Sequence, residues 1–122
     1  MYKSYSELGN QPEKNRDLYS VLELTTNEQK AQIINSTHIV CVDIYANWCG
    51  PCKQLMPRLM NMEANYPNVK FIKIDIDANM EYAQSLGIMS VPTILVYKGT
   101  TLVNKSIGAN VDSVYKKILD TL

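Results

Sequence analysis

The chain has 122 residues and a mass of 13.8 kDa, which is the size of one ordinary domain. Hydrophobic residues make up 46% of it and charged residues 20%, as in globular proteins and unlike disordered ones. Its 12 basic and 12 acidic side chains balance. This argues against a nucleic-acid-binding protein, in which basic side chains usually outnumber acidic ones. Three cysteines are too few for a disulfide-rich secreted scaffold.

The first residues show neither the apolar run of a signal peptide nor the composition of an organelle transit peptide. No segment approaches the ~20 apolar residues of a membrane span. We therefore expect a cytoplasmic protein that binds neither membrane nor nucleic acid. Residues 1–17 should form an N-terminal arm, either flexible or a short helix in which Tyr2, Tyr5 and Leu8 make an apolar stripe.

Residues 18–122 alternate between strand and helix patterns. A short strand pattern comes first, and Thr25, Thr26 or Asn27 can then cap a helix. The almost unbroken run of β-favouring apolar residues at 39–45 is typical of a central strand that is buried on both faces.

The segment after residue 50 has apolar side chains three and four residues apart, which predicts a helix. Pro51 lies in the first turn, where its missing N–H is tolerated, whereas Pro57 lies inside the helix and should kink it. A second buried strand is predicted at 69–77, followed by a short helix capped by Asp77 or Asn79.

The short helix should turn Met80, Ala83 and Leu86 inward. A strand at 93–97 should then pair with 101–107 as a hairpin. Asn110 should cap a last helix, whose apolar residues follow the helical period along one face.

Strands that alternate with helices favour parallel pairing through right-handed crossovers, and the final hairpin adds an antiparallel part. The fold class is therefore α/β. We predict one domain over residues 18–122, built on a central mixed five-stranded sheet flanked by four helices.

Cys49 and Cys52 are three residues apart at the start of a predicted helix. This spacing puts both sulfurs on one side of the first turn, close enough for a disulfide. The partial positive charge and free N–H groups of a helix N-terminus favour a thiolate, and can lower a cysteine pKa from about 8.5 to ~3.5–7.5. Cys49 should be the exposed nucleophile, and Cys52, one turn deeper, should resolve the mixed disulfide.

Residues 48–52 read Trp-Cys-Gly-Pro-Cys after a buried strand, and from about residue 18 onward the chain resembles the thioredoxin family. The other matching features, in chain order, are Asp43 in a strand, Pro57 inside a helix, Lys73 ahead of Asp75 and Asp77, the Val91-Pro92-Thr93 loop and the Gly108-Ala109 pair. The resemblance implies the thioredoxin fold, with Gly50 and Pro51 between the two redox-active cysteines.

The resemblance also implies that Asp43 is a buried acid that takes and returns the proton of Cys52. An Asp inside an apolar strand is unfavourable when charged, so its pKa should rise towards working pH. Lys73 would be its electrostatic partner. The alternatives are a hydrogen-bonded structural carboxylate at Asp43 and a strand-edge Lys73 that reaches solvent.

Pro92 matches the cis-proline of the family, and the backbone of its neighbour Val91 would pair with an extended substrate segment by strand addition. A flat apolar rim for substrate binding would surround Cys49. Its members would be Trp48, Ile76, Val91, Gly108 and Ala109. A Trp at position 48 could otherwise belong to the core.

Cys41 lies in the buried run and is expected to be a core residue, as free cysteines commonly are. A zinc site made of His38, Cys41, Cys49 and Cys52 is an alternative. It is disfavoured because Cys41 should lie inside a strand and no knuckle turn surrounds His38. We therefore expect no metal, and no cofactor other than the redox-active disulfide Cys49–Cys52.

The resemblance predicts a protein thiol–disulfide oxidoreductase that reduces disulfides in protein substrates. It would serve electron transport and cell redox homeostasis, be recharged by an NADPH-dependent thioredoxin reductase, and act as a monomer. One alternative is a disulfide isomerase or oxidase on the same fold, but the Gly-Pro dipeptide between the cysteines resembles the reducing type. The other is a binding subunit whose cysteines are idle.

Overall fold

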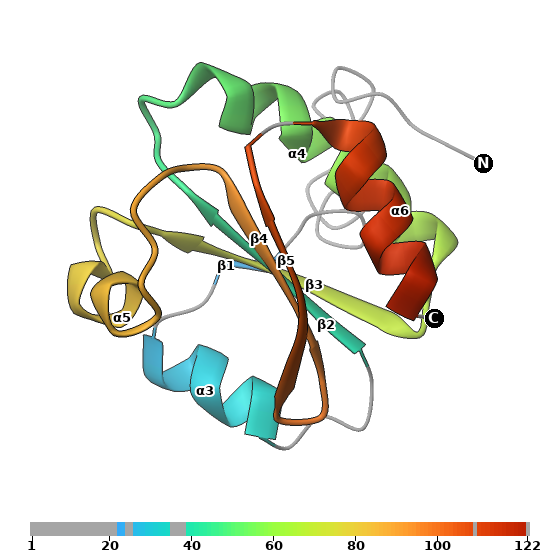
Figure 1. Ribbon diagram of the computed structural model, residues 1–122, viewed down its shortest axis with the longest axis horizontal. Coiled ribbons are helices and arrows are strands. Elements are labelled where there is room, and N and C mark those ends of the chain that lie inside the picture. Colours follow the sequence, from blue (N-terminus) through green and yellow to red (C-terminus); the bar gives the residue numbers. More distant parts are fainter. Residues whose placement is uncertain (1–21, 24–25, 35–38, 109, 122) are drawn as a thin grey trace, which may run out of the picture.

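The computed structural model describes residues 22–23, 26–34, 39–108 and 110–121, and in them five strands form one mixed sheet (Figure 1). The strands are β1 (Leu22–Glu23), β2 (Ile39–Tyr45), β3 (Val69–Asp75), β4 (Thr93–Lys98) and β5 (Thr101–Ile107). Their order is β1-β3-β2-β4-β5; β1, β3 and β2 are parallel, and the β2–β4 and β4–β5 pairs are antiparallel. The predicted α/β fold with a mixed sheet is confirmed, whereas the predicted arm, residues 1–17, lies outside the described residues.

The described helices pack on the two faces of this sheet. They are α3 (Thr26–Ile34), α4 (Gly50–Asn65), α5 (Met80–Ser85) and α6 (Val111–Thr121). Apolar side chains of α4 and α6 make one core with one face of the sheet, and those of α3 and α5 make a second core with the other (Figure 1). The molecule is therefore a three-layer α/β sandwich in which the sheet is covered on both sides.

The central strand β2 lies between β3 and β4. Its even-numbered residues Val40, Val42 and Ile44 pack in the core of α3 and α5, whereas Cys41 packs in the core of α4 and α6. Burial on both faces explains why its sequence shows no polar alternation. Because side chains alternate along a strand, Asp43 shares the face of Cys41 and so points to the layer of α4.

One strand boundary and one side-chain orientation after β3 differ from prediction. This strand ends at Asp75, two residues early, because the Asp75 side chain accepts a hydrogen bond from the backbone N–H of Asp77 at 2.9 Å. Met80 does not face inward as predicted, since 59% of it is exposed. Ala83 is buried as predicted, and Tyr82 is the other buried residue of the six-residue helix α5.

Helix α4 runs unbroken from Gly50 to Asn65 with Pro57 inside it. At α6 the predicted cap is confirmed, because Asn110 Oδ1 accepts a hydrogen bond from the backbone N–H of Ser113 at 3.0 Å. The α4 and α6 helices thus begin at the residues that the sequence indicates.

Leu59 and Leu119 form a matched pair for testing this core, because both are helical leucines but only Leu59 is fully buried. We expect Leu59→Ala to lower the free energy of unfolding by ~2–5 kcal/mol, through lost apolar burial and the cavity left behind. Leu119→Ala should lower it by less than about 1 kcal/mol. Urea unfolding of the oxidised protein measures both, and equal losses would contradict the described packing.

Candidate active site

Two cysteines lie where the chain leaves the buried end of β2 and enters α4. Cys49 is the N-cap residue of α4, and Cys52 lies one turn into the helix. They form a disulfide across a Cα–Cα distance of 5.3 Å. The backbone N–H of Cys52 donates to Cys49 Sγ at 3.2 Å, so an unpaired amide of the helix N-terminus points at this sulfur. That amide and the helix dipole stabilise negative charge at Cys49 once the disulfide is reduced.

The expectation of an exposed Cys49 is wrong for this disulfide form. Only 4% of Cys49 is exposed. Tyr45 and Ala46 from the end of β2 pack with the two cysteines, and Ile76 and Val91 from two loops pack against them. Residues at the end of β2 and in two loops therefore cover the Cys49 side chain.

Asp43 is the buried acid of the site. Only 1% of it is exposed, and neither carboxyl oxygen has a hydrogen-bond partner among the described residues. Burial raises its pKa to about 7, and the positive charge of Lys73 acts in the opposite direction. The alternative of a hydrogen-bonded structural carboxylate finds no partner in the described part of the chain.

Lys73 on β3 is the register partner of Asp43 on β2. It is half-buried, and its Nζ lies 5.4 Å from the centroid of the Tyr45 ring. Lys73, Tyr45 and Cys52 line the same cavity of about 250 Å³, together with Lys53 from α4. The lysine therefore lies beside the redox pair as well as beside Asp43.

Sequence reasoning missed two residues of this cluster. The Tyr45 hydroxyl donates to Glu23 Oε2 at 2.5 Å. Burial, this hydrogen bond and the charge of Glu23 all raise the pKa of Tyr45. Strand alternation after Asp43 could have marked Tyr45, but Glu23 is brought to it only by the pairing of β1 with β3.

The structure describes four of the five residues predicted to form a substrate rim, and their role as a rim stays a prediction. Trp48 is 71% exposed, which excludes a core role, and its Nε1–H donates to Asp77 Oδ2 at 2.9 Å. Ile76 and Val91 are half-buried against the cysteines, and the Val91–Pro92 peptide bond is cis. The backbone N–H of Gly108 donates to the Pro92 carbonyl at 2.9 Å, whereas Ala109 lies outside the described residues.

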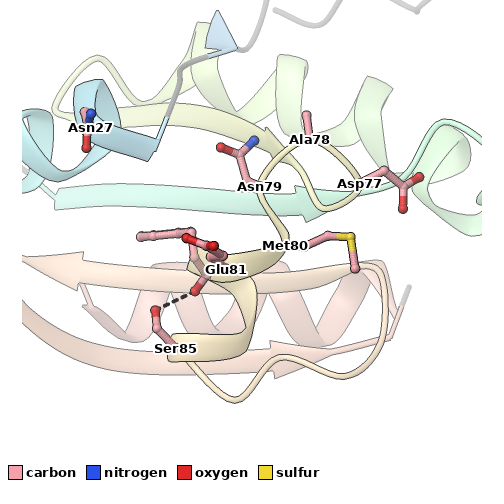
Figure 2. A pocket seen from close by; sticks show the side chains of 8 residues that line it. Asn27, Asp77, Ala78, Asn79, Met80, Glu81 and Ser85 are labelled. Atoms are coloured by element: carbon pink, nitrogen blue, oxygen red, sulfur yellow. Dashed lines mark hydrogen bonds between the residues drawn. The ribbon is translucent and has the colours of Figure 1, made fainter.

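A second cavity, of about 620 Å³, lies between the segment 77–85 and Asn27, and Figure 2 shows its lining residues. Asp77, the acceptor of the Trp48 hydrogen bond, lines it, and so do Met80, Glu81 and Ser85 of α5 and Asn27 of α3. No cysteine lines this cavity. The hydrogen bond between Asp77 and Trp48 places it next to the redox centre.

Cys41 is buried among apolar residues between the sheet and the helices α4 and α6. Burial, and to a smaller extent the charge of Asp43, raises the pKa of its thiol, so it stays protonated and unreactive. His38 of the alternative zinc set lies outside the described residues. Among those described, no group of three or more His, Cys, Asp and Glu side chains is placed to hold a metal ion.

A dithiol–disulfide pair at the N-terminus of a helix, next to a buried acid and a cis-proline loop, defines the active site of a thiol–disulfide oxidoreductase. The thioredoxin family model matches residues 20–121, and the chain belongs to the thioredoxin family.

Relatives and solved structures agree with this assignment. The mitochondrial thioredoxin-3 of Saccharomyces cerevisiae is 35% identical over 101 residues, 83% of this chain and 80% of that protein. Thioredoxin 1 of Plasmodium falciparum is 36% identical over 97 residues, 80% of this chain and 92% of that protein. The crystal structure of thioredoxin NaTrxh from Nicotiana alata superimposes with a TM-score of 0.78 at 34% identity, over 83% of this chain and 91% of that one.

The chain is therefore a protein-disulfide oxidoreductase that reduces protein disulfides through Cys49 and Cys52. None of the helices in the described ranges has the length and apolarity needed to cross a membrane.

The raised pKa of Asp43 makes stability depend on pH. Its pKa moves from 3.8 in the unfolded chain to about 7 in the fold, so the unfolded state releases this proton first. The free energy of unfolding should therefore fall as pH rises from about 4 to about 7 and then level off. Between pH 5 and pH 8 this loss amounts to about 2–3 kcal/mol.

Denaturant unfolding of the oxidised wild type and of Asp43→Asn across this pH range measures the effect. All other groups titrate in both proteins, so only the wild type should show the additional fall in the free energy of unfolding that Asp43 causes. Parallel curves for the two proteins would contradict the assignment of a raised pKa to Asp43.

Proposed function

We propose that the Cys49–Cys52 pair receives electrons from an NADPH-dependent thioredoxin reductase and passes them to disulfides in protein substrates, with Cys49 as the attacking thiolate. The observation that supports this most directly is the backbone N–H of Cys52, which donates to Cys49 Sγ at the helix N-terminus. Cys52 follows Gly50 and Pro51 in the first turn of α4, where backbone amides have no intrahelical partner.

The reaction has two exchange steps. The Cys49 thiolate attacks one sulfur of the substrate disulfide, forms a mixed disulfide and releases the first substrate thiolate. Cys52, as a thiolate, then attacks Cys49 Sγ, closes the Cys49–Cys52 disulfide and releases the second substrate thiolate. Two electrons pass from the protein dithiol to the substrate, and no cofactor beyond this disulfide takes part.

Asp43 is proposed to accept the proton of Cys52 in the second step and to return it when the disulfide is reduced again. A general base works best when its pKa lies near the working pH, and burial raises the pKa of Asp43 to about 7. Lys73, its register partner, would be the electrostatic partner that stabilises the ionised form.

The substrate would bind around the disulfide as an extended segment. The backbone of Val91, beside cis-Pro92, would pair with that segment, and Trp48 and Ile76 would supply apolar contact. Gly108 and Ala109 would complete the rim. A structural neighbour comes from a study of thiol resolution in yeast mitochondrial 1-Cys peroxiredoxin via glutathione and thioredoxin systems, so peroxiredoxins are one substrate class worth testing.

We assign this activity to a monomer in the cytoplasm, where it would serve electron transport and redox homeostasis. A similar protein of yeast is mitochondrial, so subcellular fractionation is the test of compartment. Sedimentation at several concentrations is the test of the monomer.

Turnover depends on Cys49 in this proposal, whereas Cys41 takes no part. In an insulin-reduction assay with dithiothreitol as donor, Cys49→Ser should fall to the rate of dithiothreitol alone, because no attacking thiolate is left. Cys41→Ala is the matched control and should keep wild-type turnover. A loss of turnover in folded Cys41→Ala, or survival in Cys49→Ser, would contradict the proposed roles.

Removal of the resolving thiol should leave substrates attached. Cys52→Ser should accumulate substrate proteins as mixed disulfides on Cys49. Dithiothreitol should release these substrates, and mass spectrometry then identifies them. The wild type should not trap them, and with NADPH and a thioredoxin reductase it should sustain NADPH oxidation when insulin is added. Absence of trapped substrates would indicate the binding-subunit alternative, in which the cysteines are idle.

A further inference from the structure

The register of the sheet places Lys73 between two carboxyl groups. On one side its partner on β1 is Glu23, and on the other its partner on β2 is Asp43. Side chains of register partners project to the same face of a sheet, so all three share the face that carries α4. One ammonium group therefore has two acidic neighbours, of which Glu23 is exposed and Asp43 is buried.

Tyr45 connects Glu23 to Lys73. Its hydroxyl donates to Glu23 Oε2 at 2.5 Å, and the Lys73 Nζ lies 5.4 Å from the centroid of its ring. This distance is within the ~6 Å over which a cation is attracted to an aromatic face. A hydrogen bond to a charged acceptor is among the stronger kinds, so the ring is held in place. The contacts run from Glu23 to Tyr45 and from Tyr45 to Lys73.

We propose that Glu23 is a positioning residue for proton transfer: while it accepts the Tyr45 hydroxyl it is kept from drawing the Lys73 ammonium, which rests on the Tyr45 ring, away from Asp43. This inference rests on the proposed role of Asp43 as the proton acceptor of Cys52. Glu23 touches neither the substrate nor the cysteines, so its effect on the reaction passes through Tyr45 and Lys73.

Charged and titratable groups reach this cluster from every element that packs around it. They are Glu23 from β1, Cys41 and Tyr45 from β2, Lys73 and Asp75 from β3, and Cys52 and Lys53 from α4. Cys41 and Tyr45 both have raised pKa values and stay neutral, and Cys52 is held in the disulfide. Of the carboxylates beside Asp43, only Glu23 accepts the Tyr45 hydroxyl.

Substitution of either partner of the Tyr45–Glu23 hydrogen bond should shift the pKa of Asp43, and the two shifts should have opposite signs. Glu23→Gln removes the carboxylate that would compete with Asp43 for Lys73, so the pKa of Asp43 should fall. Tyr45→Phe leaves the Glu23 charge without its hydroxyl donor, and that carboxylate then attracts Lys73 away from Asp43. The pKa of Asp43 should therefore rise in Tyr45→Phe.

Carbon-13 NMR titration of the Asp43 carboxyl group in the oxidised full chain measures these shifts. We expect a fall of at least ~0.5 in Glu23→Gln and a rise in Tyr45→Phe. The double variant should follow Glu23→Gln, because no charge is left to compete for Lys73. Asp120→Asn, which removes an exposed carboxylate near the end of α6, is the control and should leave the pKa unchanged.

The pH midpoint of insulin reduction should move in the same direction as the Asp43 pKa measured by NMR. At a fixed pH below that midpoint, a pKa shift of ~0.5 should change the rate by about threefold. The inference is overturned if Glu23→Gln and Tyr45→Phe leave the Asp43 pKa within ~0.2 of wild type, or shift it in the same direction. Asp43→Asn separates this failure from that of the proposed function. If Asp43→Asn retains the wild-type pH profile, the proton-acceptor role and the inference fall together. If Asp43→Asn loses the pH dependence, the proton-acceptor role of Asp43 stands. The Asp43 pKa shifts in Glu23→Gln and Tyr45→Phe then decide the inference on Glu23.

Discussion

The active site depends on how firmly β2 is held at its end. This strand pairs with β3 on one side and β4 on the other, and both of its faces are buried. The chain leaves it at Tyr45 and enters α4 at Gly50, so the few residues between have little freedom. Cys49 must therefore cap α4, where the free amide of Cys52 meets its sulfur. The chemistry follows from this junction, because a helix N-terminus favours the thiolate.

The same strand carries a feature that opposes stability. Asp43 lies within it without a hydrogen-bond partner among the described residues, in a position where an apolar residue would pack better. A carboxyl group so placed is poorly suited to holding a fold together and well suited to exchanging a proton near neutral pH. Lys73 moderates the effect without abolishing it, and the ring of Tyr45, whose hydroxyl donates to Glu23, lies next to that lysine. Stability and reactivity are thus adjusted by one small cluster of side chains on neighbouring strands.

Local patterns predicted most of the fold, and contacts between distant segments account for what they missed. The run at 39–45 and the spacing of Cys49 and Cys52 depend on neighbouring residues, so the sequence alone indicated both. The pairing of Glu23 with Tyr45 needs the register of β1 against β3, which no local pattern contains. The cover over Cys49 likewise comes from two separate loops. Helix α5 has six residues, too few for the helical period to fix its buried face, and the inward prediction for Met80 was accordingly wrong.

In the proposed reaction, Asp43 takes the proton of Cys52 while the disulfide closes. Trp48 is the only tryptophan and adjoins Cys49, so stopped-flow fluorescence can follow single-turnover oxidation of the reduced protein by a disulfide substrate from pH 5 to pH 9. The ratio of wild-type to Asp43→Asn rate constants should rise as pH passes about 7 and level off at about tenfold or more. A ratio that stays near one at every pH would contradict the account.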